Sequence, residues 1–394
     1  MFNGTPGLSI FVLEMAGNPS VSAKIGILGG GQLGRMLLQK AADWNLITHV
    51  LDPDPNAPCK DIASSFTIGH FNDEAAVYEF GKELEVLTIE IEHVNTTALE
   101  RLEQEGRKIF PQPRVIRLIQ DKGAQKSFFR EHGIPTAPFT LVNNKSEILS
   151  GGTELPVMQK LCRGGYDGKG VQPLRSTADL DKAFDAPSVL EAWVPFEREV
   201  AVIVARNSRG HCKAFPPVEM DFNKEANLVE FLFSPSSLSP AVAAEAERIA
   251  RQVAEALDMV GVLAVEMFLT TTGELLVNEL APRPHNSGHH TIEANQTSQY
   301  EQHLRAILGL PLGDTSIIQP AVMVNLLGEK GFEGPARYEG LEEALSIPGV
   351  HVHLYGKLLT KPFRKMGHVT VCHPDLEEAR RIARTIRDTL KVKA

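Results

Sequence analysis

Residues 24–36 read KIGILGGGQLGRM, and this stretch decides the fold class of the first part of the chain. Lys24–Leu28 is a short apolar run that predicts a strand, and the three glycines that follow it predict a turn. Apolar residues then recur at helical spacing from Leu33 to Trp44, and Ile47–Leu51 predicts a second strand. Strand, helix and strand at this spacing predict a right-handed βαβ unit with a parallel sheet, which is an α/β fold.

The glycine turn itself allows two interpretations. Gly29 to Gly34 fits the pattern GxGxxG between a strand and a helix, and Asp52 follows at the end of the next strand. This combination is typical of a dinucleotide site, where backbone N–H groups at a helix N-terminus hold phosphate. The same turn also occurs in many α/β domains that bind no nicotinamide. A NAD-dependent oxidoreductase therefore stays open as one interpretation of this motif.

Polar side chains alternate with apolar ones in a third predicted strand, Val86–Ile91. Thr88, Glu90 and Glu92 would share one face at the carboxyl end of a parallel strand, where ligands of open α/β sheets bind. Carboxylates at that place suit the hydroxyl or amine groups of a ligand. The alternative is a solvated edge strand.

The composition is that of an ordinary globular protein and disfavours several classes. A length of 394 residues predicts two or three domains. The chain is 43% hydrophobic and 23% charged, which argues against disorder or a coiled coil. A net charge of −9 disfavours binding to nucleic acid or to an anionic membrane surface. No apolar run approaches the roughly 20 residues that span a bilayer, and the N-terminus lacks the basic start of a signal peptide. We therefore expect a cytoplasmic protein with a disordered extension at residues 1–23.

The rest of the chain divides by its pattern of helices and strands. We expect a first domain at residues 24–120, a second at 121–319 with a lid at about 150–210, and a third at 320–394. Helices are predicted at 122–132, 240–257 and 376–390, and strands at 262–269 and 275–280.

A glycine-rich loop, GGYDGKG at Gly164–Gly170, is the most unusual stretch. Four glycines in seven residues suit a loop that approaches a ligand closely and moves as a lid. It is not a P-loop, since Arg163 stands where the first glycine of that motif would be and no Ser or Thr follows Lys169. Its backbone N–H groups could still cover phosphates, with Lys160 and Lys169 supplying charge. The alternative is a plain hairpin turn.

Glu266 and Glu279 supply the strongest geometric prediction. Their two strands flank Thr270–Gly273, so a hairpin centred there would place the two carboxylates directly opposite each other. Like charges at that spacing are destabilising unless a pKa rises or a cation binds, and oxygen ligands of this kind suit Mg²⁺. The alternative is an exposed, unpaired couple. Apolar neighbours expected on the same face are Phe268, Val277 and Leu275.

Basic and polar residues follow this hairpin. Arg283 begins the sequence RPHNSGHH, and a guanidinium next to Glu279 would suit a transferred phosphoryl group. His285 and His289 have the spacing of zinc ligands on a helix, but the neighbouring prolines and glycine disfavour a helix, so we expect a polar loop. A basic cluster in the tail predicts a pocket for a phosphate monoester or, alternatively, a solvated face. Its members are Lys357, Lys361, Arg364, Lys365 and His368.

Four motifs taken together resemble a known family. They are KIGILGGGQLGRM at 24–36, GGYDGKG at 164–170, NELAPRPHNSGH at 278–289 and FRKMGH at 363–368. In this order and spacing they resemble the 5-(carboxyamino)imidazole ribonucleotide synthetases, from about Lys24 to the C-terminus. The resemblance implies an ATP-grasp fold, with α/β and α+β parts. Its N-terminal pre-ATP-grasp domain would be Rossmann-like without binding nicotinamide, and its small C-terminal domain would be β-rich.

The resemblance also implies an activity. Members are ligases of purine biosynthesis that use ATP and bicarbonate to carboxylate the amine of 5-aminoimidazole ribonucleotide through carboxyphosphate, releasing ADP and phosphate. The metal would be Mg²⁺ or Mn²⁺, and the protein would be a homodimer. Within the same fold, a formate-dependent glycinamide ribonucleotide transformylase, a biotin carboxylase and a non-catalytic nucleotide sensor stay open.

The matched motifs assign roles residue by residue. The implied metal ligands are Glu266 and Glu279, and the implied catalytic residues are Arg283, Lys169 and Asn286. The residues implied to contact ATP are Lys122, Lys160, Gly165, Tyr166, Asp167, Gly168, Lys169, Gly170, Val171, Glu191, Ala192, Trp193, Val194, Glu199, Asn223, Asn278 and Glu279. Those implied to contact the imidazole ribonucleotide are Tyr166, Lys169, Glu92, Asn286, Lys357 and Arg364. The hinge at 191–194 would hold the adenine, and Glu199 the ribose. Lys169 and Asn223 depart from the family, which often has Arg and His there.

Overall fold

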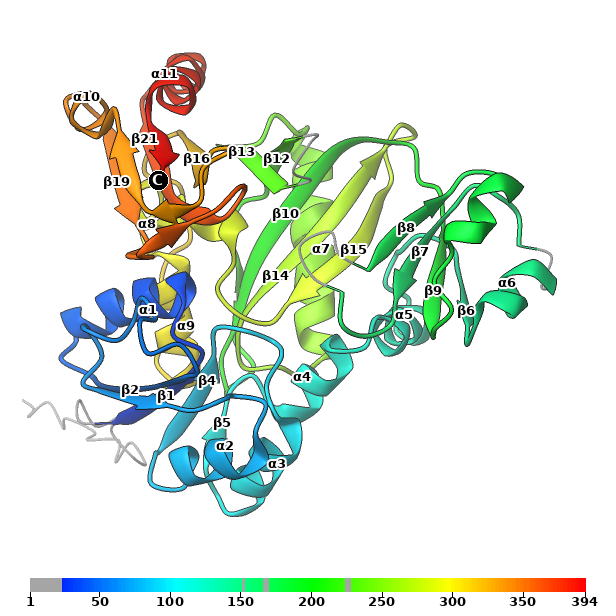
Figure 1. The fold of residues 1–394 in the computed structure, drawn as a ribbon, viewed down its shortest axis with the longest axis horizontal. Coiled ribbons are helices and arrows are strands. Elements are labelled where there is room, and N and C mark those ends of the chain that lie inside the picture. The colour runs from blue at the N-terminus through cyan, green and yellow to red at the C-terminus, as the bar shows by residue number, and fades with distance from the viewer. Residues whose placement is uncertain (1–22, 151–152, 166–169, 224–227) are drawn as a thin grey trace, which may run out of the picture.

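The computed structural model describes residues 23–150, 153–165, 170–223 and 228–394. Three larger sheets organise these residues: a five-stranded sheet, a four-stranded sheet and a nine-stranded sheet. In Figure 1 the five-stranded sheet lies at the lower left, the four-stranded sheet forms a lobe at the right, and the nine-stranded sheet lies between and above them. The expected extension at residues 1–23 lies, except for Ala23, outside the described residues.

The five-stranded sheet is parallel, with strand order β3-β2-β1-β4-β5. Its strands are β1 (Lys24–Leu28), β2 (Ile47–Asp52), β3 (Ser65–Ile68), β4 (Val86–Ile89) and β5 (Lys108–Ile109). Its helices are α1 (Gln32–Asp43), α2 (Glu74–Gly81), α3 (Thr96–Gln104) and α4 (Pro113–Ile119). The predicted βαβ unit is confirmed, because β1 and β2 pair in parallel on either side of α1 in the chain. Helices cover both faces of such a sheet, which explains why the strands contain apolar runs.

The glycine turn after β1 is filled by the protein's own carboxylates. The Gly30 N–H donates to Asp52 Oδ2 at 2.6 Å, and the Gly31 and Gly34 N–H groups donate to the two oxygens of Glu90 at 2.7 and 2.9 Å. A dinucleotide pyrophosphate would have to displace two acidic side chains from these amides. The dinucleotide interpretation of this motif is therefore wrong, because its phosphate-binding groups are already used.

The same contacts explain why the third strand is shorter than predicted. Strand β4 ends at Ile89, two residues early, because Glu90 turns towards the glycine turn. Strand β4 lies between β1 and β5, so the alternative of a solvated edge strand is also wrong. Thr88 is buried and its hydroxyl lies 2.8 Å from His303 Nε2. Thr88 therefore bonds β4 to His303, and Glu90 bonds the end of β4 to the glycine turn. Of the three predicted residues, Glu92 is left as a candidate for binding a ligand.

Replacing Gly31 with Ala should destabilise the first domain. The added Cβ would lie 2.6 Å from Glu90 Oε1, so the Glu90 side chain must move and lose its bonds to the turn. We expect the free energy of unfolding to fall by about 1–3 kcal/mol, measured by urea denaturation. An unchanged midpoint would show that Glu90 does not hold the turn.

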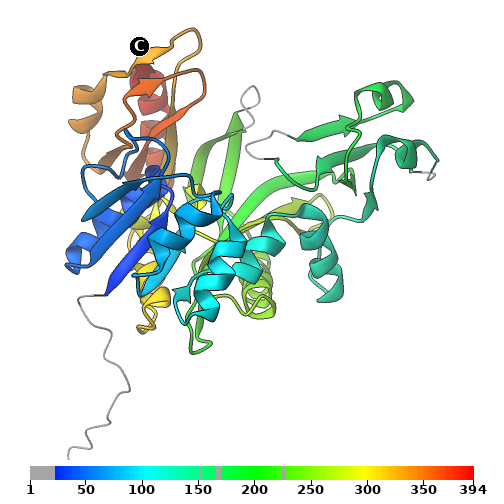
Figure 2. The same ribbon diagram turned by 60° about the horizontal axis from the view of Figure 1, so that its bottom comes forward.

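The lobe at the right of Figure 1 contains the antiparallel four-stranded sheet, in the order β6-β9-β7-β8. Its elements are α5 (Lys122–Glu131), β6 (Phe139–Val142), α6 (Lys145–Ser150), β7 (Val157–Leu161), β8 (Val171–Leu174), a 3-10 helix (Thr177–Lys182) and β9 (Ser188–Ala192). Figure 2 shows the same lobe standing away from the rest of the molecule. The predicted helix at 122–132 is confirmed within one residue.

The nine-stranded sheet is built around one long strand, β10 (Phe196–Arg206). Its other strands are β11 (Cys212–Ala214), β12 (Val218–Asn223), β13 (Leu228–Ser234), β14 (Gly261–Thr270), β15 (Leu275–Ala281), β16 (Ala321–Leu327), β19 (Val350–Leu354) and β21 (Lys365–Cys372). Helix α7 (Pro240–Ala256) packs its buried side chains Ile249 and Val253 into the same apolar core as Val202 of β10, as its period predicts. The segment after β15 contains a 3-10 helix (Asn286–Gly288), α8 (Thr291–Ala294) and α9 (Gln299–Ile307).

The C-terminal strands continue the central sheet instead of forming a separate one. Strand β16 pairs with β13, so that Phe231 lies opposite Val324, and β21 pairs with β16. Helix α11 (Leu376–Thr389) packs Ile382 and Ile386 into a core shared with Phe231. The remaining elements are β17 (Gly334–Pro335), β18 (Arg337–Glu339), α10 (Leu341–Leu345), β20 (Leu359–Thr360) and β22 (Lys391–Lys393).

Candidate functional site

The hairpin of β14 and β15 brings two carboxylates together. Glu266 pairs directly with Glu279 across the two strands, as predicted. On the other side of β14, Ala201 of β10 pairs with Glu266, and Glu199 pairs with Phe268. Because side chains alternate along a strand, Glu199 and Glu266 share one face of the sheet. The opposite face is the apolar core.

The route by which the pair forms differs from the prediction. From Met267 to Leu269 the register is shifted by one residue, so that Met267 lies opposite Val277, and a β-bulge restores the pairing at Glu279. The expectation that Val277 and Leu275 lie beside the carboxylates is therefore wrong, because both are in the core on the other face. The extra residue at the bulge is Asn278, and the bulge re-aims its side chain, as bulges do near functional sites.

The two carboxylates differ in their electrostatics. Burial raises the pKa of Glu266 to about 8, and the neighbouring charges of Glu279 and Glu199 add to this rise. Burial also acts on Glu279, but Lys122 offsets it and holds the pKa of that carboxyl below its ordinary value. The Lys122 ammonium lies 2.5 Å from Glu279 Oε1. Without a cation, Glu266 is therefore held towards its protonated form and Glu279 towards its ionised form.

The lobe contributes a buried charge triad that faces this hairpin. Glu191 of β9 lies between two ammonium groups, with Lys126 at 3.1 Å and Lys160 at 2.9 Å. Burial lowers the pKa of Lys126 to about 8 in spite of this contact. Lys160 also donates to Asn278 Oδ1 at 2.8 Å, so it connects the lobe to the bulge of the hairpin. Lys122, Lys160, Asn278 and Glu279, which the resemblance assigns to ATP, thus lie close together.

The hinge residues after Glu191 lie where the lobe joins β10. The Ala192 N–H already donates to Pro138 O at 2.8 Å, and the Trp193 side chain is exposed. Val194 lies in the short connection between β9 and β10. Asn223 lies at the end of β12, where its amide donates to Glu230 Oε1 at 3.4 Å.

Glu199 predicts a pH dependence of stability. Burial raises its pKa from 4.5 to about 7, so between these values the folded chain keeps a proton that the unfolded chain has lost. The stability from that proton is therefore lost as the pH rises towards 7. We expect Glu199→Gln, which cannot ionise, to match the unliganded wild type at pH 5 and to exceed its free energy of unfolding by about 1–3 kcal/mol at pH 8.5. Urea denaturation at both values tests this, and an equal difference at both would contradict it.

The glycine-rich loop connects the antiparallel strands β7 and β8. Lys160 pairs with Val171, and a Cβ at Gly170 would lie 3.0 Å from Gly165 Cα, so the two ends of the loop meet closely. A loop between two paired strands fits both the lid and the hairpin interpretation, so the strand pairing does not decide between them. Tyr166, Asp167, Gly168 and Lys169, which the sequence assigns to ATP or to the second substrate, lie outside the described residues.

The loop after β15 carries three polar side chains, of which His285 approaches the carboxylate pair. Arg283 Nε lies 2.8 Å from Glu92 Oε1, and His285 Nε2 lies 3.6 Å from Glu266 Oε1. Asn286 and Asn325 exchange two hydrogen bonds, of 2.8 and 2.9 Å. The segment is a polar loop with a single short 3-10 turn, as predicted.

The basic cluster of the tail is only partly as predicted. Lys357 Nζ donates to Lys365 O at 2.7 Å and Arg364 Nη1 to Leu359 O at 2.8 Å, so both cations belong to one folded segment. The positive charge of Lys365 offsets part of the rise in the pKa of Glu266, so this segment lies within electrostatic reach of the hairpin. The inclusion of His368 is wrong, because its ring is fully buried and burial holds its pKa well below the ordinary value.

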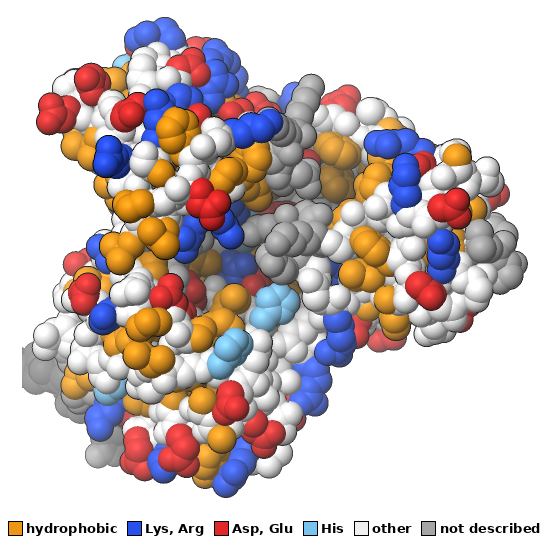
Figure 3. Space-filling view, in the orientation of Figure 1, with side chains coloured by type: hydrophobic (Ala, Val, Ile, Leu, Met, Phe, Trp, Pro, Cys, Tyr) orange, Lys and Arg blue, Asp and Glu red, His pale blue; other side chains and the backbone are white. Residues whose placement is uncertain are grey.

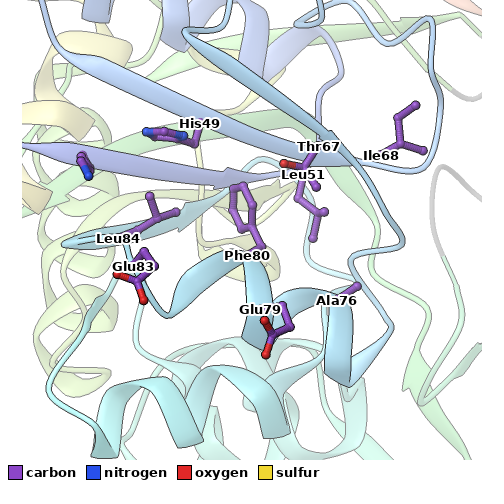
Figure 4. A pocket seen from close by; sticks show the side chains of 10 residues that line it. His49, Leu51, Thr67, Ile68, Ala76, Glu79, Phe80, Glu83 and Leu84 are labelled. Atoms are coloured by element: carbon purple, nitrogen blue, oxygen red, sulfur yellow. The ribbon is translucent and has the colours of Figure 1, made fainter.

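The two best-defined cavities of the described residues lie elsewhere. One, of about 410 Å³, lies between the five-stranded sheet and α2, where Leu51 and Phe80 line it together with Glu79 and Glu83 (Figure 4). The other, of about 290 Å³, lies between α1 and α9. The site is instead an open hollow where the lobe meets the two larger sheets, with Lys and Arg side chains visible in it (Figure 3).

The described residues contain neither a larger cluster of metal-binding side chains nor a helix that could span a membrane. No group of three or more His, Cys, Asp or Glu side chains in residues 23–150, 153–165, 170–223 and 228–394 could hold a metal ion without other ligands. Over the same ranges, no helix has the length and apolar character that a membrane span requires.

Sequence reasoning missed two contributors. Lys126 lies four residues after Lys122 on α5, so both point to the same side of the helix, and this spacing was a usable signal. Asn325 lies in a later strand and only the fold brings it to Asn286.

Comparison with sequence families divides the chain into three matches. Residues 22–120 match the ribonucleotide synthetase preATP-grasp domain, and residues 127–300 match the ATP-grasp domain. Residues 321–382 match the phosphoribosylaminoimidazole carboxylase C-terminal domain.

Two relatives of known name match most of this chain, but the chain covers different shares of their lengths. It is 39% identical over 355 residues to the N5-carboxyaminoimidazole ribonucleotide synthase of Bacillus subtilis, a match that covers 88% of this chain and 91% of the relative. It is 40% identical over 358 residues to the chloroplastic phosphoribosylaminoimidazole carboxylase of Vigna aconitifolia, which covers 88% of this chain but 63% of that longer protein.

Solved structures agree. The N5-carboxyaminoimidazole ribonucleotide synthetase of Thermotoga maritima superposes with a TM-score of 0.87 at 43% identity, covering 94% of this chain and 99% of that one. The N5-carboxyaminoimidazole synthase of Aspergillus clavatus, in complex with ADP and 5-aminoimidazole ribonucleotide, gives a TM-score of 0.85 at 37% identity, covering 93% and 98%.

Proposed function

The chain belongs to the N5-carboxyaminoimidazole ribonucleotide synthase family, and from this premise we propose that it uses ATP to carboxylate 5-aminoimidazole ribonucleotide with bicarbonate. It is an ATP-grasp ligase that forms a C–N bond in purine biosynthesis. The observation that carries the proposal is the opposed pair Glu266 and Glu279, which faces Lys122 and Lys160 where the lobe meets the central sheet. This arrangement suits a nucleoside triphosphate with a divalent cation.

The carboxylate pair fits Mg²⁺, or Mn²⁺ as a substitute. Two hard oxygen donors lie opposite each other. Burial and the neighbouring charges of Glu279 and Glu199 raise the pKa of Glu266, so a cation bound there would favour its ionised form. Two side chains cannot fill an octahedral shell, so water and phosphate oxygens would supply the rest. When bound, the ion would neutralise charge on the transferred phosphoryl group.

The residues of the lobe would bind the ATP. Lys122 and Lys160 would contact the phosphates, and the hinge at 191–194 with Glu199 would hold the adenine and the ribose. Gly165, Gly170 and Val171 would close the loop over the phosphates and keep water out. Glu279 would exchange its contact with Lys122 for the cation, which frees that ammonium group for a phosphate oxygen.

The reaction needs activation of a poor electrophile. A bicarbonate oxygen attacks the γ-phosphorus of ATP, the bond to the β-phosphate oxygen breaks, and ADP leaves with its electron pair. The product is carboxyphosphate. The amine nitrogen of 5-aminoimidazole ribonucleotide then attacks the carboxyl carbon, the C–O bond to phosphate breaks, and the nitrogen loses a proton. Arg283 would stabilise negative charge on the phosphoryl group or the carboxyl oxygens.

The second substrate would bind on the side of the tail. Lys357 and Arg364 would pair with its phosphate, while Asn286 and Glu92 would offer hydrogen bonds to the sugar and the base. Glu92 would then divide its charge between Arg283 and the substrate. We also propose a homodimer, by analogy with the family.

One assay tests the function. ADP release is measured with and without 5-aminoimidazole ribonucleotide, in bicarbonate-depleted and bicarbonate-replete buffer. Release that needs both supports the proposal. Release that needs formate and glycinamide ribonucleotide instead would favour a transformylase, and no release with any amine would favour a nucleotide sensor.

A further inference from the structure

One buried side chain fixes the backbone of the loop that carries Arg283, His285 and Asn286. This side chain is Gln299, the first residue of α9, and it is fully buried. Its carbonyl oxygen accepts from the His285 N–H at 2.9 Å, and its amide nitrogen donates to the His285 carbonyl at 2.8 Å. One amide group therefore satisfies both backbone groups of a single loop residue.

Further contacts leave Gln299 little freedom. Its amide nitrogen lies 3.2 Å from His289 Nδ1, and its backbone N–H donates to the Thr291 hydroxyl at 2.8 Å. The Gly288 backbone packs so closely that an added Cβ there would lie 2.4 Å from Gln299 Oε1. The side chain thus contacts the loop at three places, from His285 to His289.

The clamped residue lies in the middle of the proposed chemistry. His285 follows Arg283 by two residues and precedes Asn286, and its imidazole lies 3.6 Å from Glu266 Oε1. A shift of the His285 backbone would move all three side chains together. Small displacements of this kind are costly, because catalysis by positioning is sensitive to changes of about 1 Å.

We propose that Gln299 is a positioning residue that holds the loop from Arg283 to His289 in register with the metal carboxylates and the imidazole ribonucleotide. It touches no substrate itself and acts through the His285 backbone. The proposal rests on the function proposed above and adds to it a residue in α9.

The same helix supplies a matched control. Gln302 is also fully buried, and its amide makes the same reciprocal pair of hydrogen bonds, at 2.8 and 2.9 Å, with the backbone of Gly313. Gly313 lies in a loop to which no role in the reaction is assigned. Both glutamines therefore clamp a loop in the same way, and only Gln299 clamps the loop of the site.

The first test compares Gln299→Met with Gln302→Met. Methionine keeps the length and removes both bonds, so the two variants should lose a similar amount of thermal stability. Only Gln299→Met should lower kcat/KM for 5-aminoimidazole ribonucleotide, by about tenfold or more, while its affinity for ADP stays within about threefold of wild type. Equal kinetics in the two variants would overturn the proposal.

A second variant keeps the test decisive if Gln299→Met does not fold. In Gln299→Glu a protonated carboxyl can still accept from the His285 N–H and donate to its carbonyl, whereas a carboxylate cannot donate. Burial raises the pKa of such a carboxyl into the measurable range. Relative to wild type, kcat/KM of Gln299→Glu should therefore fall by about tenfold or more between pH 6 and pH 8.5, and that of Gln302→Glu should not. A ratio that stays constant with pH would overturn the proposal.

The two proposals fail in different ways. If the wild-type protein releases no ADP in response to 5-aminoimidazole ribonucleotide, the function is wrong. If the wild type is active and both glutamine positions behave alike, the function stands and the positioning role of Gln299 is wrong.

Discussion

Replacing Glu279 with Gln should lower kcat by about 100-fold or more, since the change removes the charge of one of two proposed metal ligands. The amide has nearly the same shape, so the hairpin should keep its register. The loss should appear in kcat for ADP release at saturating ATP, and raised Mg²⁺ should restore only part of it. The Lys122 ammonium, which lies 2.5 Å from Glu279 Oε1 in the unliganded enzyme, also loses its counter-charge, although the amide oxygen can still accept a hydrogen bond from it.

A matched control is available in the same hairpin. Glu274 is exposed in the turn between β14 and β15, and Glu274→Gln changes the net charge by the same amount. It should leave kcat unchanged within about twofold, as is usual for a surface substitution away from such features. Near-normal turnover of Glu279→Gln would refute the metal assignment.

Replacing Glu191 with Leu should lower the free energy of unfolding by about 3–5 kcal/mol, because it leaves buried ammonium groups without their counter-charge. The Lys126 side chain is 3% exposed, and its amine lies 3.1 Å from Glu191 Oε1. Burial already lowers the pKa of Lys126 to about 8 with the partner present, so the lysine should lose its proton without it. Urea denaturation at pH 7 measures the loss, and KM for ATP should rise because Lys160 is held by the same carboxylate.

The double variant Lys126→Met/Glu191→Leu tests the cause. It removes the most buried cation together with the anion, so it should be more stable than Glu191→Leu alone. If the single variant is as stable as wild type, or if the double variant is less stable than the single one, the triad is not a buried charge network.

The spacing of glycine, apolar and polar residues predicted those parts of the fold that depend on residues close together in the sequence. The spacing around Gly29–Gly31 gave the first βαβ unit, and the turn after Thr270 gave the carboxylate pair. The predicted pairing of Glu266 with Glu279 is confirmed, but the predicted register between Met267 and Leu269 is wrong by one residue. A bulge at Asn278 compensates this shift, and the alternation of apolar and polar residues does not reveal it. The order of apolar and polar residues in this stretch is compatible with a regular hairpin and also with a bulged hairpin whose turn is shifted by one residue. Packing of the folded strands decides which of the two forms.

Contacts between distant segments could not be predicted in this way. The GxGxxG pattern does not show that Asp52 and Glu90 occupy its amides, since that depends on two later strands. His368 was grouped with exposed cations because its neighbours in the sequence are basic. Strand β21 is buried on both faces, however, and the His368 ring lies beside His289, His353 and Tyr355. The clamp by Gln299 likewise joins residues that only the folded loop brings together.

The pairing of β13 with β16 has a consequence for shortened versions of this protein. A chain that stops before Pro320 would keep β12 on one side of β13 but lack β16 on the other, which leaves the backbone groups of residues 231–234 on that side without their strand partner. Phe231 and Phe233 would lose the cover that α11 provides. A bare strand with aromatic side chains is a template for intermolecular association, so such a fragment should precipitate instead of remaining a smaller working enzyme.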